Sequence, residues 1–323
     1  MRVEQGSSEA VVRATRALTR DVRGFEIEPV SGVAAWAPGA HLDVSVLIGE
    51  RTETRSYSLV GEADPSAYRI AVKRQPESRG GSAYMWSLEP GARLTIGAPN
   101  NHFELALDSP EYLLVAGGIG VTPILGMALS LAARRARFRV LYAARSRDDL
   151  ALADELAAAV GDRLEVFVSG EGRRIDPRMA VAQLGVSAEL YLCGPLRMIE
   201  DFRRAWSAAD RRPSAFRVET FGSSGAFAPE PFRVRVAGLG VEVVVPADRS
   251  MLDTLEEAGV EIVADCRRGE CGLCAVDVVE ASGRIDHRDV FFSDHQRHEG
   301  RKICACVSRA SGEIVIDVGW RPD

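Results

Sequence analysis

The sequence predicts three domains of different fold class: an antiparallel β-barrel, an α/β domain built on a parallel sheet, and a C-terminal α+β domain. Two changes of pattern along the 323 residues support this division. Short alternating segments give way to strand–helix repeats near residue 107, and a Gly/Ser/Pro-rich stretch interrupts those repeats at residues 223–231. The expected boundaries are therefore 1–106, 107–222, a linker at 223–231, and 232–323.

Composition and charge exclude some kinds of partner. The chain is 46% hydrophobic and 27% charged, which is ordinary for a soluble protein, and it has a formal net charge of -6 with a pI near 5.6. This acidic balance argues against nucleic acid as a partner. The N-terminal segment MRVEQGSSEAVV is polar and shows no charged-then-apolar leader, so we expect a cytoplasmic protein with reduced thiols.

One uncharged segment, Tyr112–Ala133, is long enough to cross a bilayer. Its middle argues against a spanning helix, because Gly117, Gly118, Gly120 and Pro123 would break one. The residues before these breaks suit a buried strand, and those after them suit a helix. We therefore expect neither a membrane span nor a membrane partner.

The first domain is predicted from four strand-like runs separated by turn-rich pieces. The runs are AHLDVSVLI, ETRSYSLVG, YRIAVKR and ARLTIGAP, and the turns contain PGA, DPSA, RGGS and EPGA. Short strands joined by turns of this composition favour a small antiparallel barrel.

The second domain is predicted from strand-like runs that alternate with helical ones, as in βαβ units around a parallel sheet. Its first strand ends in AGGIGVTP, where Gly118 and Gly120 allow a tight turn with close backbone approach to a phosphate. Alone the motif is weak, because it lacks the third glycine of GxGxxG and a structural turn explains it equally well. A second strand, in LYLCGPLRMIEDF, also ends in a turn that opens a helix, so two strand ends can face one crevice.

The C-terminal domain begins with a predicted hairpin, FRVRVAG with VEVVVPA, and a predicted helix, MLDTLEEAGV. Five of the six cysteines follow, spaced as Cys266-x4-Cys271-x2-Cys274 with Cys304 and Cys306 about thirty residues later. Three thiolates on one loop and one from a distant segment can hold a [2Fe-2S] cluster, and this is the plant-type ferredoxin spacing. Two alternatives stay open: unrelated buried cysteines, and a structural zinc site, which usually has two CxxC-like hooks rather than one CxxC and one CxC.

Gly269 and Gly272 support the iron–sulfur interpretation, because residues without a Cβ let the loop curl until its backbone N–H groups point at the sulfurs. The fourth ligand is either Cys304, at the gap usual in plant ferredoxins, or Cys306, for which the chain matches a plant ferredoxin without gaps from Asp286 onward. We predict Cys306. Three nearby histidines are expected to be solvated loop residues: His287, His295 and His298.

Taken together, these motifs resemble those of the ferredoxin reductase superfamily and, within it, of phthalate dioxygenase reductase and its relatives. The resemblance rests on the ferredoxin-like end and on segments that keep their order over nearly the whole chain: RSYSL, AVKR, RGGS, NNHFEL, GGIGVTP, YLCGP and ETF. It implies that the C-terminal domain is a ferredoxin-like (β-grasp) domain with the cluster ligands Cys266, Cys271, Cys274 and Cys306.

The resemblance also implies FMN, because relatives with a C-terminal ferredoxin domain use FMN, whereas many with an N-terminal one use FAD. Taken singly, the residues concerned could be ordinary strand or turn residues. In the family pattern, the flavin ring and ribityl chain would contact Arg55, Ser56, Tyr57, Ser58, Ala71, Val72 and Lys73. The phosphate would contact Arg79, Gly80, Gly81 and Ser82, and the second domain would add Thr122 and Phe221.

For the nicotinamide nucleotide, the family pattern implies two groups of residues. The pyrophosphate would contact Gly117, Gly118, Gly120 and Val121. The nicotinamide would be framed by Cys193, Gly194 and Pro195, with Met198 packed on the dinucleotide. Cys193 is the predicted catalytic residue, because in the wider superfamily this cysteine lies near the hydride-transfer position; a small buried residue is the alternative. NADH is favoured over NADPH: Arg145 also occurs in NADH-using relatives, although Arg147 could bind a 2′-phosphate.

The resemblance implies an NADH-dependent oxidoreductase in which FMN takes a hydride and electrons leave singly through the [2Fe-2S] cluster. The implied acceptor is the terminal component of a Rieske-type oxygenase, in a dioxygenase or O-demethylase system, with a cytochrome P450 as the alternative. A non-enzymatic iron–sulfur electron carrier or redox sensor is the alternative from another class. We expect a monomer.

Overall fold

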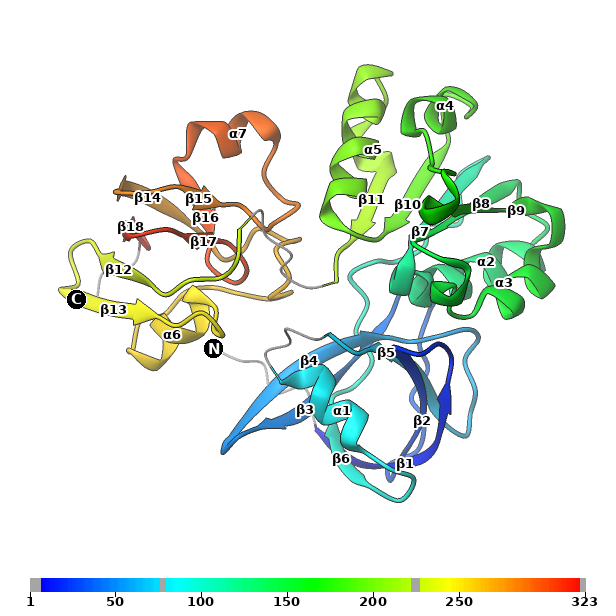
Figure 1. Ribbon diagram of the computed structural model, residues 1–323, viewed down its shortest axis with the longest axis horizontal. Helices are drawn as coiled ribbons and strands as arrows, with labels where there is room; N and C mark the ends of the chain where they lie inside the picture. Colours follow the sequence, from blue (N-terminus) through cyan, green and yellow to red (C-terminus); the bar gives the residue numbers. More distant parts are fainter. Residues whose placement is uncertain (1–6, 76–79, 222–226, 320–323) are drawn as a thin grey trace. The chain divides into compact units, whose positions relative to one another are not determined.

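Figure 1 shows the computed structural model of the chain, which describes residues 7–75, 80–221 and 227–319. The chain divides into two compact units, residues 2–219 and residues 220–323. The first unit contains a barrel and a parallel sheet, and the second contains a smaller mixed sheet. The three predicted fold classes are confirmed. The predicted domain boundaries stay a prediction, because the barrel and the parallel sheet belong to one unit.

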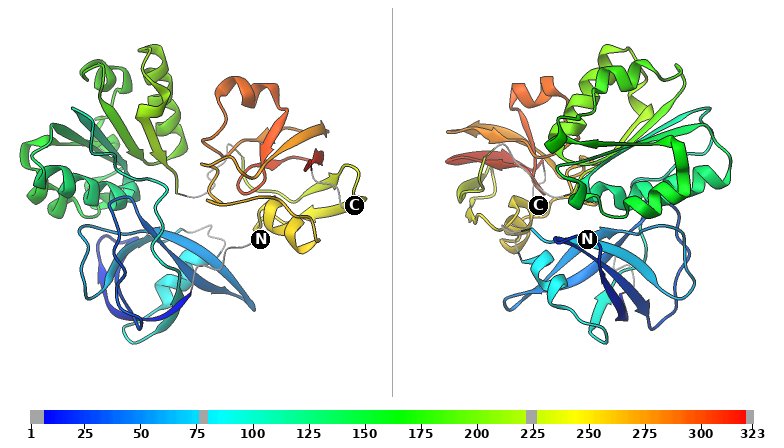
Figure 2. Two further views of the ribbon diagram at one scale, coloured as in Figure 1. Left: turned by 180° about the vertical axis from the view of Figure 1, so that it is seen from behind. Right: turned by 45° about the vertical axis from the view of Figure 1, so that its right-hand side comes forward.

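The barrel is a six-stranded antiparallel sheet in the order β4-β3-β6-β1-β2-β5, seen from two further directions in Figure 2. Alternate side chains point into a shared core that includes Val12, Ile27 and Leu42. An isolated bridge between Leu59 and Ile70 joins the end of one edge strand to the other, which closes the sheet. The elements are β1 (Ser8–Ala17), β2 (Val22–Pro29), β3 (His41–Ile48), β4 (Arg51–Ser58), β5 (Tyr68–Lys73), α1 (Gly81–Ser87) and β6 (Arg93–Ile96).

The second half of this unit is a five-stranded parallel sheet in the order β11-β10-β7-β8-β9. Strands β7 and β10 are buried along their whole length, as their apolar sequences predict. The strands are β7 (Tyr112–Gly117), β8 (Phe138–Ala144), β9 (Leu164–Val168), β10 (Glu189–Cys193) and β11 (Phe216–Glu219). The α-helices are α2 (Val121–Ala133), α3 (Ala153–Val160), α4 (Pro177–Ala182) and α5 (Leu196–Ala208). Five 3-10 turns are η1 (Gly118–Gly120), η2 (Arg147–Asp149), η3 (Gly161–Arg163), η4 (Ser169–Glu171) and η5 (Pro213–Ala215).

The uncharged segment Tyr112–Ala133 forms β7, η1 and α2, as the sequence predicts. Among the described residues, no helix is long and apolar enough to cross a membrane.

The second unit contains a mixed sheet in the order β13-β12-β18-β14-β16 and a separate two-stranded sheet of β15 and β17. The predicted hairpin is confirmed as the antiparallel pair β12 and β13, and β12 also pairs in parallel with β18. The strands are β12 (Phe232–Val236), β13 (Val241–Val245), β14 (Ala275–Ala281), β15 (Ile285–Asp286), β16 (Lys302–Cys304), β17 (Arg309–Ala310) and β18 (Glu313–Asp317). The predicted helix is α6 (Met251–Glu257), and a second helix is α7 (Asp294–Glu299). Buried Met251, Leu252 and Leu255 of α6 belong to the core of this unit.

Candidate functional site

The first candidate site lies where strands β7 and β10 end side by side. The two strands pair in parallel, with Cys193 opposite Ala116. The order of the strands in the sheet reverses between them, because β8 and β9 continue from β7 on one side and β10 lies on the other. In open α/β sheets a ligand binds outside the carboxyl ends of the strands at such a reversal. The two strand ends that the sequence singled out therefore meet.

Glycine is required where the turn after β7 touches the turn after β10. A Cβ on Gly120 would lie 2.1 Å from the carbonyl oxygen of Cys193, and a Cβ on Gly117 would lie 2.6 Å from Pro195 Cδ. A Cβ on Gly194 would in turn lie 3.2 Å from the Cα of Gly117. The structure thus brings together residues that were predicted for the pyrophosphate and for the nicotinamide.

Gly118 differs from its neighbours because the space beside it is open. Its φ is +56°, and an added Cβ would meet no heavy atom within 4 Å beyond its chain neighbours. A phosphate can approach the backbone here, so this turn fits the pyrophosphate of a dinucleotide. Val121 begins α2 and is buried, and the Thr122 hydroxyl donates to the Ile119 carbonyl oxygen at 3.0 Å, which stabilises the turn. Met198 Sδ would lie 3.2 Å from a Cβ on Gly117, so this side chain lies beside the turn on which the dinucleotide is predicted to bind.

A buried carboxylate, Glu219, links this sheet edge to the barrel. Glu219 ends β11 opposite Cys193, and both residues are fully buried. Its Oε2 accepts a hydrogen bond from the Ser58 hydroxyl at 3.1 Å and lies 4.0 Å from Cys193 Sγ. A buried carboxylate depends on such donors, because its ionised form loses the hydration it has in water. Sequence reasoning quoted Glu219 only within ETF, although an acidic residue at the end of a buried strand was an available signal.

The predicted flavin residues of β4 lie against the start of α1. A Cβ on Gly81 would lie 2.8 Å from Arg55 Nε, and Gly80 has a φ of +97° that glycine adopts without strain. Arg55 also pairs with Glu53 at 2.6 Å. The described part of RGGS opens a helix instead of forming a hairpin turn, and it lies beside a residue predicted for the ring. Arg79 lies outside the described residues.

The other predicted flavin residues of the barrel are buried or are held by hydrogen bonds and ion pairs to neighbouring residues of the barrel. Burial raises the pKa of the Tyr57 hydroxyl, so this side chain stays neutral. The Ser56 hydroxyl donates to Asp43 at 2.5 Å, and Lys73 pairs with Asp21 at 3.1 Å. Two further side chains, Ala71 and Val72, are buried on the edge strand β5, and the Ser82 hydroxyl accepts from the backbone N–H of Gln75 at 3.2 Å.

Phe221 belongs to the second unit, so its predicted place against the flavin stays a prediction. It follows Thr220, whose backbone N–H donates to Glu270 Oε1 at 2.8 Å. Glu270 lies between two of the predicted cluster ligands, so this hydrogen bond ties the start of the unit to the cysteine loop.

The cysteine loop between α6 and β14 is the second candidate site. The backbone N–H groups of Arg268, Glu270 and Cys271 all point at Cys266 Sγ, each at 3.4 Å. Gly269, with a φ of +75°, makes this curl possible. Backbone donors directed at a sulfur favour a thiolate and stabilise the negative charge of an iron–sulfur cluster, so the loop fits the group that the spacing predicts.

Four of the thiols lie in two pairs, and the thiol of Cys304 also interacts with that of Cys274. Cys274 Sγ is 3.1 Å from Cys306 Sγ, and Cys266 interacts with the thiol of Cys271. Hydrogen bonds from Cys304 and Cys306 hold the pKa of Cys274 at about 3, and the same hydrogen bonds raise the pKa of the two donors. Each iron of a [2Fe-2S] cluster takes two thiolates, so paired thiols suit it. Among the described residues, no three His, Cys, Asp or Glu side chains converge on one metal ion.

The choice of the fourth ligand depends on where Cys304 and Cys306 lie. Cys304 is the last residue of β16, pairs with Ala275 of β14 and is fully buried. Cys306 lies in the turn that follows, and it interacts electrostatically with Cys266 and with the backbone of Gly269 as well as with Cys274. Cys306 therefore reaches the loop from which the other ligands come. The prediction of Cys306 is supported by this contact pattern and stays a prediction.

A fully buried carboxylate, Asp289, lies next to Gly269 of the cysteine loop. It accepts hydrogen bonds from the Ser308 hydroxyl at 3.0 Å and from the backbone N–H of Phe292 at 2.9 Å. Burial works to raise the pKa of Asp289, but its hydrogen bond with His287 and that from Phe292 outweigh burial and lower it. A Cβ on Gly269 would lie 2.8 Å from the Asp289 Cα. The expectation that His287 is solvated is wrong, because its side chain is only 8% exposed and lies 3.4 Å from Asp289.

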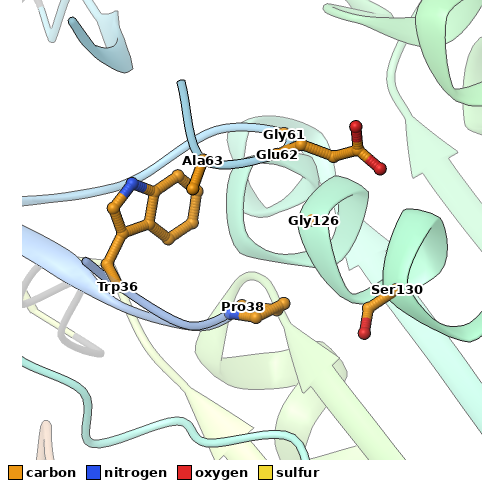
Figure 3. A pocket seen from close by; sticks show the side chains of 7 residues that line it. All are labelled: Trp36, Pro38, Gly61, Glu62, Ala63, Gly126 and Ser130. Carbon is orange, nitrogen blue, oxygen red and sulfur yellow. The ribbon is translucent and has the colours of Figure 1, made fainter. Parts of the chain in front are cut away.

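A pocket of about 340 Å³ lies elsewhere in the first unit, between loops of the barrel and helix α2. Figure 3 shows Trp36 and Pro38 on the barrel side and Ser130 of α2 opposite. The residues that line it include none of those predicted for a cofactor, so this pocket is separate from both candidate sites.

Two family models match parts of the chain. Residues 114–204 match the family model "Oxidoreductase NAD-binding domain", and residues 234–311 match "2Fe-2S iron-sulfur cluster binding domain". The chain is 36% identical over 321 residues to the phenoxybenzoate dioxygenase subunit beta of Ectopseudomonas oleovorans, covering 98% of this chain and 95% of that protein.

Solved structures resemble the chain over nearly its whole length, and two of them are representative. One is phthalate dioxygenase reductase, described as a modular structure for electron transfer from pyridine nucleotides to [2Fe-2S], with 30% identity, a TM-score of 0.78, and 97% and 98% of the two chains covered. This chain belongs to the phthalate dioxygenase reductase-like family. The other structure is a self-sufficient cytochrome P450 monooxygenase, with 32% identity, a TM-score of 0.68, and 96% of this chain but 41% of that one covered.

Family membership confirms the predicted class and cofactors. The chain is an electron-transfer oxidoreductase with a nicotinamide nucleotide, FMN and a [2Fe-2S] cluster as its redox groups. The individual contacts between these groups and the predicted residues stay predictions.

Proposed function

We propose that this chain is the reductase component of an oxygenase system: it oxidises NADH and delivers electrons one at a time to a terminal oxygenase component. One observation carries this proposal. A single chain combines a sheet edge built for a dinucleotide, with the buried Cys193, Glu219 and Ser58 beside it, and a loop with paired thiols built for an iron–sulfur cluster. A carrier or sensor needs only the second site.

The protein's own residues bind and orient the redox groups. Gly118 offers open backbone to the pyrophosphate, while the packed glycines around it fix the turn. Cys193 and the hydrogen-bonded pair of Ser58 and Glu219 form a polar cluster where the nicotinamide is expected to stack on the flavin. FMN, when bound, accepts two electrons together and releases them singly, which matches NADH to a one-electron centre. The protein contributes proximity and orientation, and no nucleophile is needed.

The barrel residues have complementary tasks in this proposal. The ring side of the flavin site is formed by β4 and the edge strand β5, and Arg55 of β4 lies next to Gly81, where the segment expected at the phosphate begins. The guanidinium of Arg79 with the backbone N–H groups of Gly80 and Gly81 would suit a phosphate dianion. In the second unit, Cys266 with Cys271 and Cys274 with Cys306 would each hold one iron.

The acceptor is proposed to be the terminal component of a Rieske-type oxygenase. The relative from E. oleovorans is named as a subunit of a dioxygenase, which supports this acceptor. A cytochrome P450 is the second candidate, because the chain also resembles part of a self-sufficient P450 monooxygenase. In both cases the electrons leave through the cluster.

The proposed function is tested with the full chain after anaerobic purification and reconstitution with FMN, iron and sulfide. NADH should bleach the flavin absorbance within seconds, and the cluster should then be reduced. Metal analysis should give about two irons per chain with acid-labile sulfide. If NADH leaves the flavin oxidised while the cluster is intact, the chain is an electron carrier or sensor; zinc in place of iron and sulfide would contradict the cluster.

The acceptor is tested separately, by mixing the reduced protein anaerobically with a purified Rieske oxygenase or a P450. Stopped-flow absorbance should show faster oxidation of the reductase by its proper partner. A P450 that oxidises the reductase faster than any Rieske component would reverse the choice. Size-exclusion chromatography with light scattering tests the predicted monomer.

A further inference from the structure

The loops that follow β8 and β9 are joined by an ion pair. Arg147 Nε and Nη2 donate to Glu171 Oε1 and Oε2 at 2.7 and 2.9 Å. Because β7, β8 and β9 are parallel neighbours, both loops lie at the sheet edge that carries the nucleotide turn. The backbone N–H of Gly170 also donates to the Arg145 carbonyl oxygen at 2.9 Å, which fixes the two loops to each other.

The order of the strands places this ion pair on the adenosine side of a bound dinucleotide. In the order β11-β10-β7-β8-β9, the turn for the pyrophosphate follows β7. The residues expected at the nicotinamide, Cys193 and Gly194, lie at and after the end of β10, so the other half of the molecule extends from β7 toward β8. The ribose that carries the 2′ group then meets the loop after β8. In nucleotide-binding α/β domains, side chains at this place distinguish NAD from NADP.

We propose that the Arg147–Glu171 pair makes this site select NADH over NADPH, an inference that rests on the proposed reductase function. The pair occupies the guanidinium fork that a 2′-phosphate would need for bidentate binding. The carboxylate oxygens of Glu171 keep lone pairs for a ribose 2′-hydroxyl and repel a phosphate dianion. Arg147, which the sequence offered as a ligand for the 2′-phosphate, is thereby withdrawn from that role.

The other charges of the loop after β8 show why Glu171 decides the outcome. Asp148 and Asp149 follow Arg147 directly, and Asp149 Oδ2 accepts the Ser146 hydroxyl at 2.8 Å, so this hydroxyl is already engaged. Arg145 is exposed, and no side chain in the described part of the chain pairs with it. Within the loop after β8, two guanidinium groups, Arg145 and Arg147, face two carboxylates, Asp148 and Asp149. Glu171 adds a third carboxylate directly at Arg147 from the loop after β9.

Removing this pair should leave the fold intact. The side chains of Arg147 and Glu171 are 68% and 41% exposed. An exposed ion pair of this kind stabilises a protein by about 0 to 1 kcal/mol. A change in nucleotide preference on substitution is therefore separable from a loss of structure.

The test compares kcat/KM for NADH and NADPH in the reconstituted full chain, with ferricyanide as electron acceptor. Glu171→Gln should raise the ratio of NADPH to NADH kcat/KM at least tenfold, because Arg147 then becomes available to the 2′-phosphate. Adding Arg147→Ala to this variant should remove the gain. The control is Glu165→Gln, which breaks the nearby exposed pair with Arg173 at 3.5 Å and should leave the ratio unchanged.

A second readout does not depend on turnover. Binding of 2′,5′-ADP and of 5′-AMP is measured by calorimetry, and Glu171→Gln should tighten 2′,5′-ADP binding at least tenfold with little change for 5′-AMP. The inference is overturned if wild type prefers NADPH, if Glu171→Gln shifts neither readout by more than twofold, or if Glu165→Gln shifts them equally. If wild type oxidises neither nucleotide, the proposed function fails, and the binding of 2′,5′-ADP still decides whether this pair excludes a 2′-phosphate.

Discussion

The turn after β7 and the cysteine loop before β14 both depend on glycine, but for different physical reasons. In the turn, a Cβ on Gly120 would collide with the backbone of a neighbouring strand, at 2.1 Å from the Cys193 carbonyl oxygen. In the loop, Gly272 has a φ of +75° and its Cβ would meet the ring of Phe291 at 2.2 Å. A strand in a parallel sheet cannot move aside, whereas an aromatic side chain can. The contact at Gly120 should therefore be less forgiving than the contact at Gly272.

The largest expected effect comes from a substitution that removes the iron–sulfur cluster of the cysteine loop and leaves the nucleotide turn unchanged. Cys306→Ser should abolish the visible absorbance of the cluster, because one iron loses half of its protein ligands. Cys304→Ser, its matched control from the same segment, should keep the cluster. Both variants should still reduce FMN with NADH, since the nucleotide turn is built from other residues. Absorbance and circular dichroism in the visible range measure the outcome, and a cluster that survives Cys306→Ser but not Cys304→Ser would reverse the assignment.

The next effect tests the nucleotide turn itself. Gly120→Ala should destabilise the parallel sheet by about 4 kcal/mol or more, because β10 must shift to admit the Cβ. Gly118→Ala, two residues away, should cost only about 1 kcal/mol, because the Cβ enters open space and only the left-handed φ is strained. Hydrogen exchange of the β7 and β10 amides reports both values in the intact chain.

Gly118→Ala adds a functional contrast in the same turn. Its Cβ would occupy the space that is expected to receive the pyrophosphate, so the KM for NADH should rise while the sheet loses only about 1 kcal/mol of stability. Equal destabilisation by Gly118→Ala and Gly120→Ala would show that the packing contact with Cys193 is not what makes glycine necessary.

In the cysteine loop, an alanine in place of glycine should destabilise the protein less than Gly120→Ala does, and a second substitution should restore part of the lost stability. Gly272→Ala should destabilise the second unit by about 3 kcal/mol, from the left-handed φ and the collision with the Phe291 ring together. Adding Phe291→Ala removes the collision and should recover about half of the loss. Hydrogen exchange of β14 and β18 measures this. If the double variant is no more stable than Gly272→Ala alone, the ring is not the obstacle.

The sequence predicted the parts of the two regions that depend on local pattern. Buried apolar runs predicted β7 and β10, and the glycine and cysteine spacings predicted both candidate sites, because most of these signals lie within a few neighbouring residues. The helix α1 was not predicted, although part of RGGS opens it.

The residues that sequence reasoning missed are those whose role depends on partners far away in the chain. Glu219 accepts a hydrogen bond from Ser58, 161 residues earlier, and Asp289 accepts one from Ser308, 19 residues later. Nothing in the local pattern around either carboxylate reveals such a partner. Both are buried carboxylates that lie next to a candidate site, and only the folded chain shows that they are buried.

The smallest expected effect is that of Asp289→Asn. Its cost to stability should depend on pH in the second unit and be absent from the nucleotide turn. The pKa of Asp289 lies below its ordinary value in the folded protein. Its ionised form therefore contributes its full stabilisation above about pH 4, which is the pKa of an unfolded aspartate. This stabilisation is lost as the pH falls through the lower pKa of the folded protein. Asp289→Asn should cost the second unit about 2 kcal/mol at pH 7, because hydrogen bonds to a charged acceptor are lost.

The difference between Asp289→Asn and wild type should then shrink as the pH is lowered from 5 toward 3, while hydrogen exchange in β7 and β10 stays the same in both proteins. The measurement is hydrogen exchange of β14 and β18 at several pH values, corrected for the intrinsic exchange rate. A difference that stays constant over this range would mean that Asp289 supports the cysteine loop through its shape alone. A difference that shrinks would show that the loop depends on a buried charge, whereas the nucleotide turn depends on the close contact of two backbones.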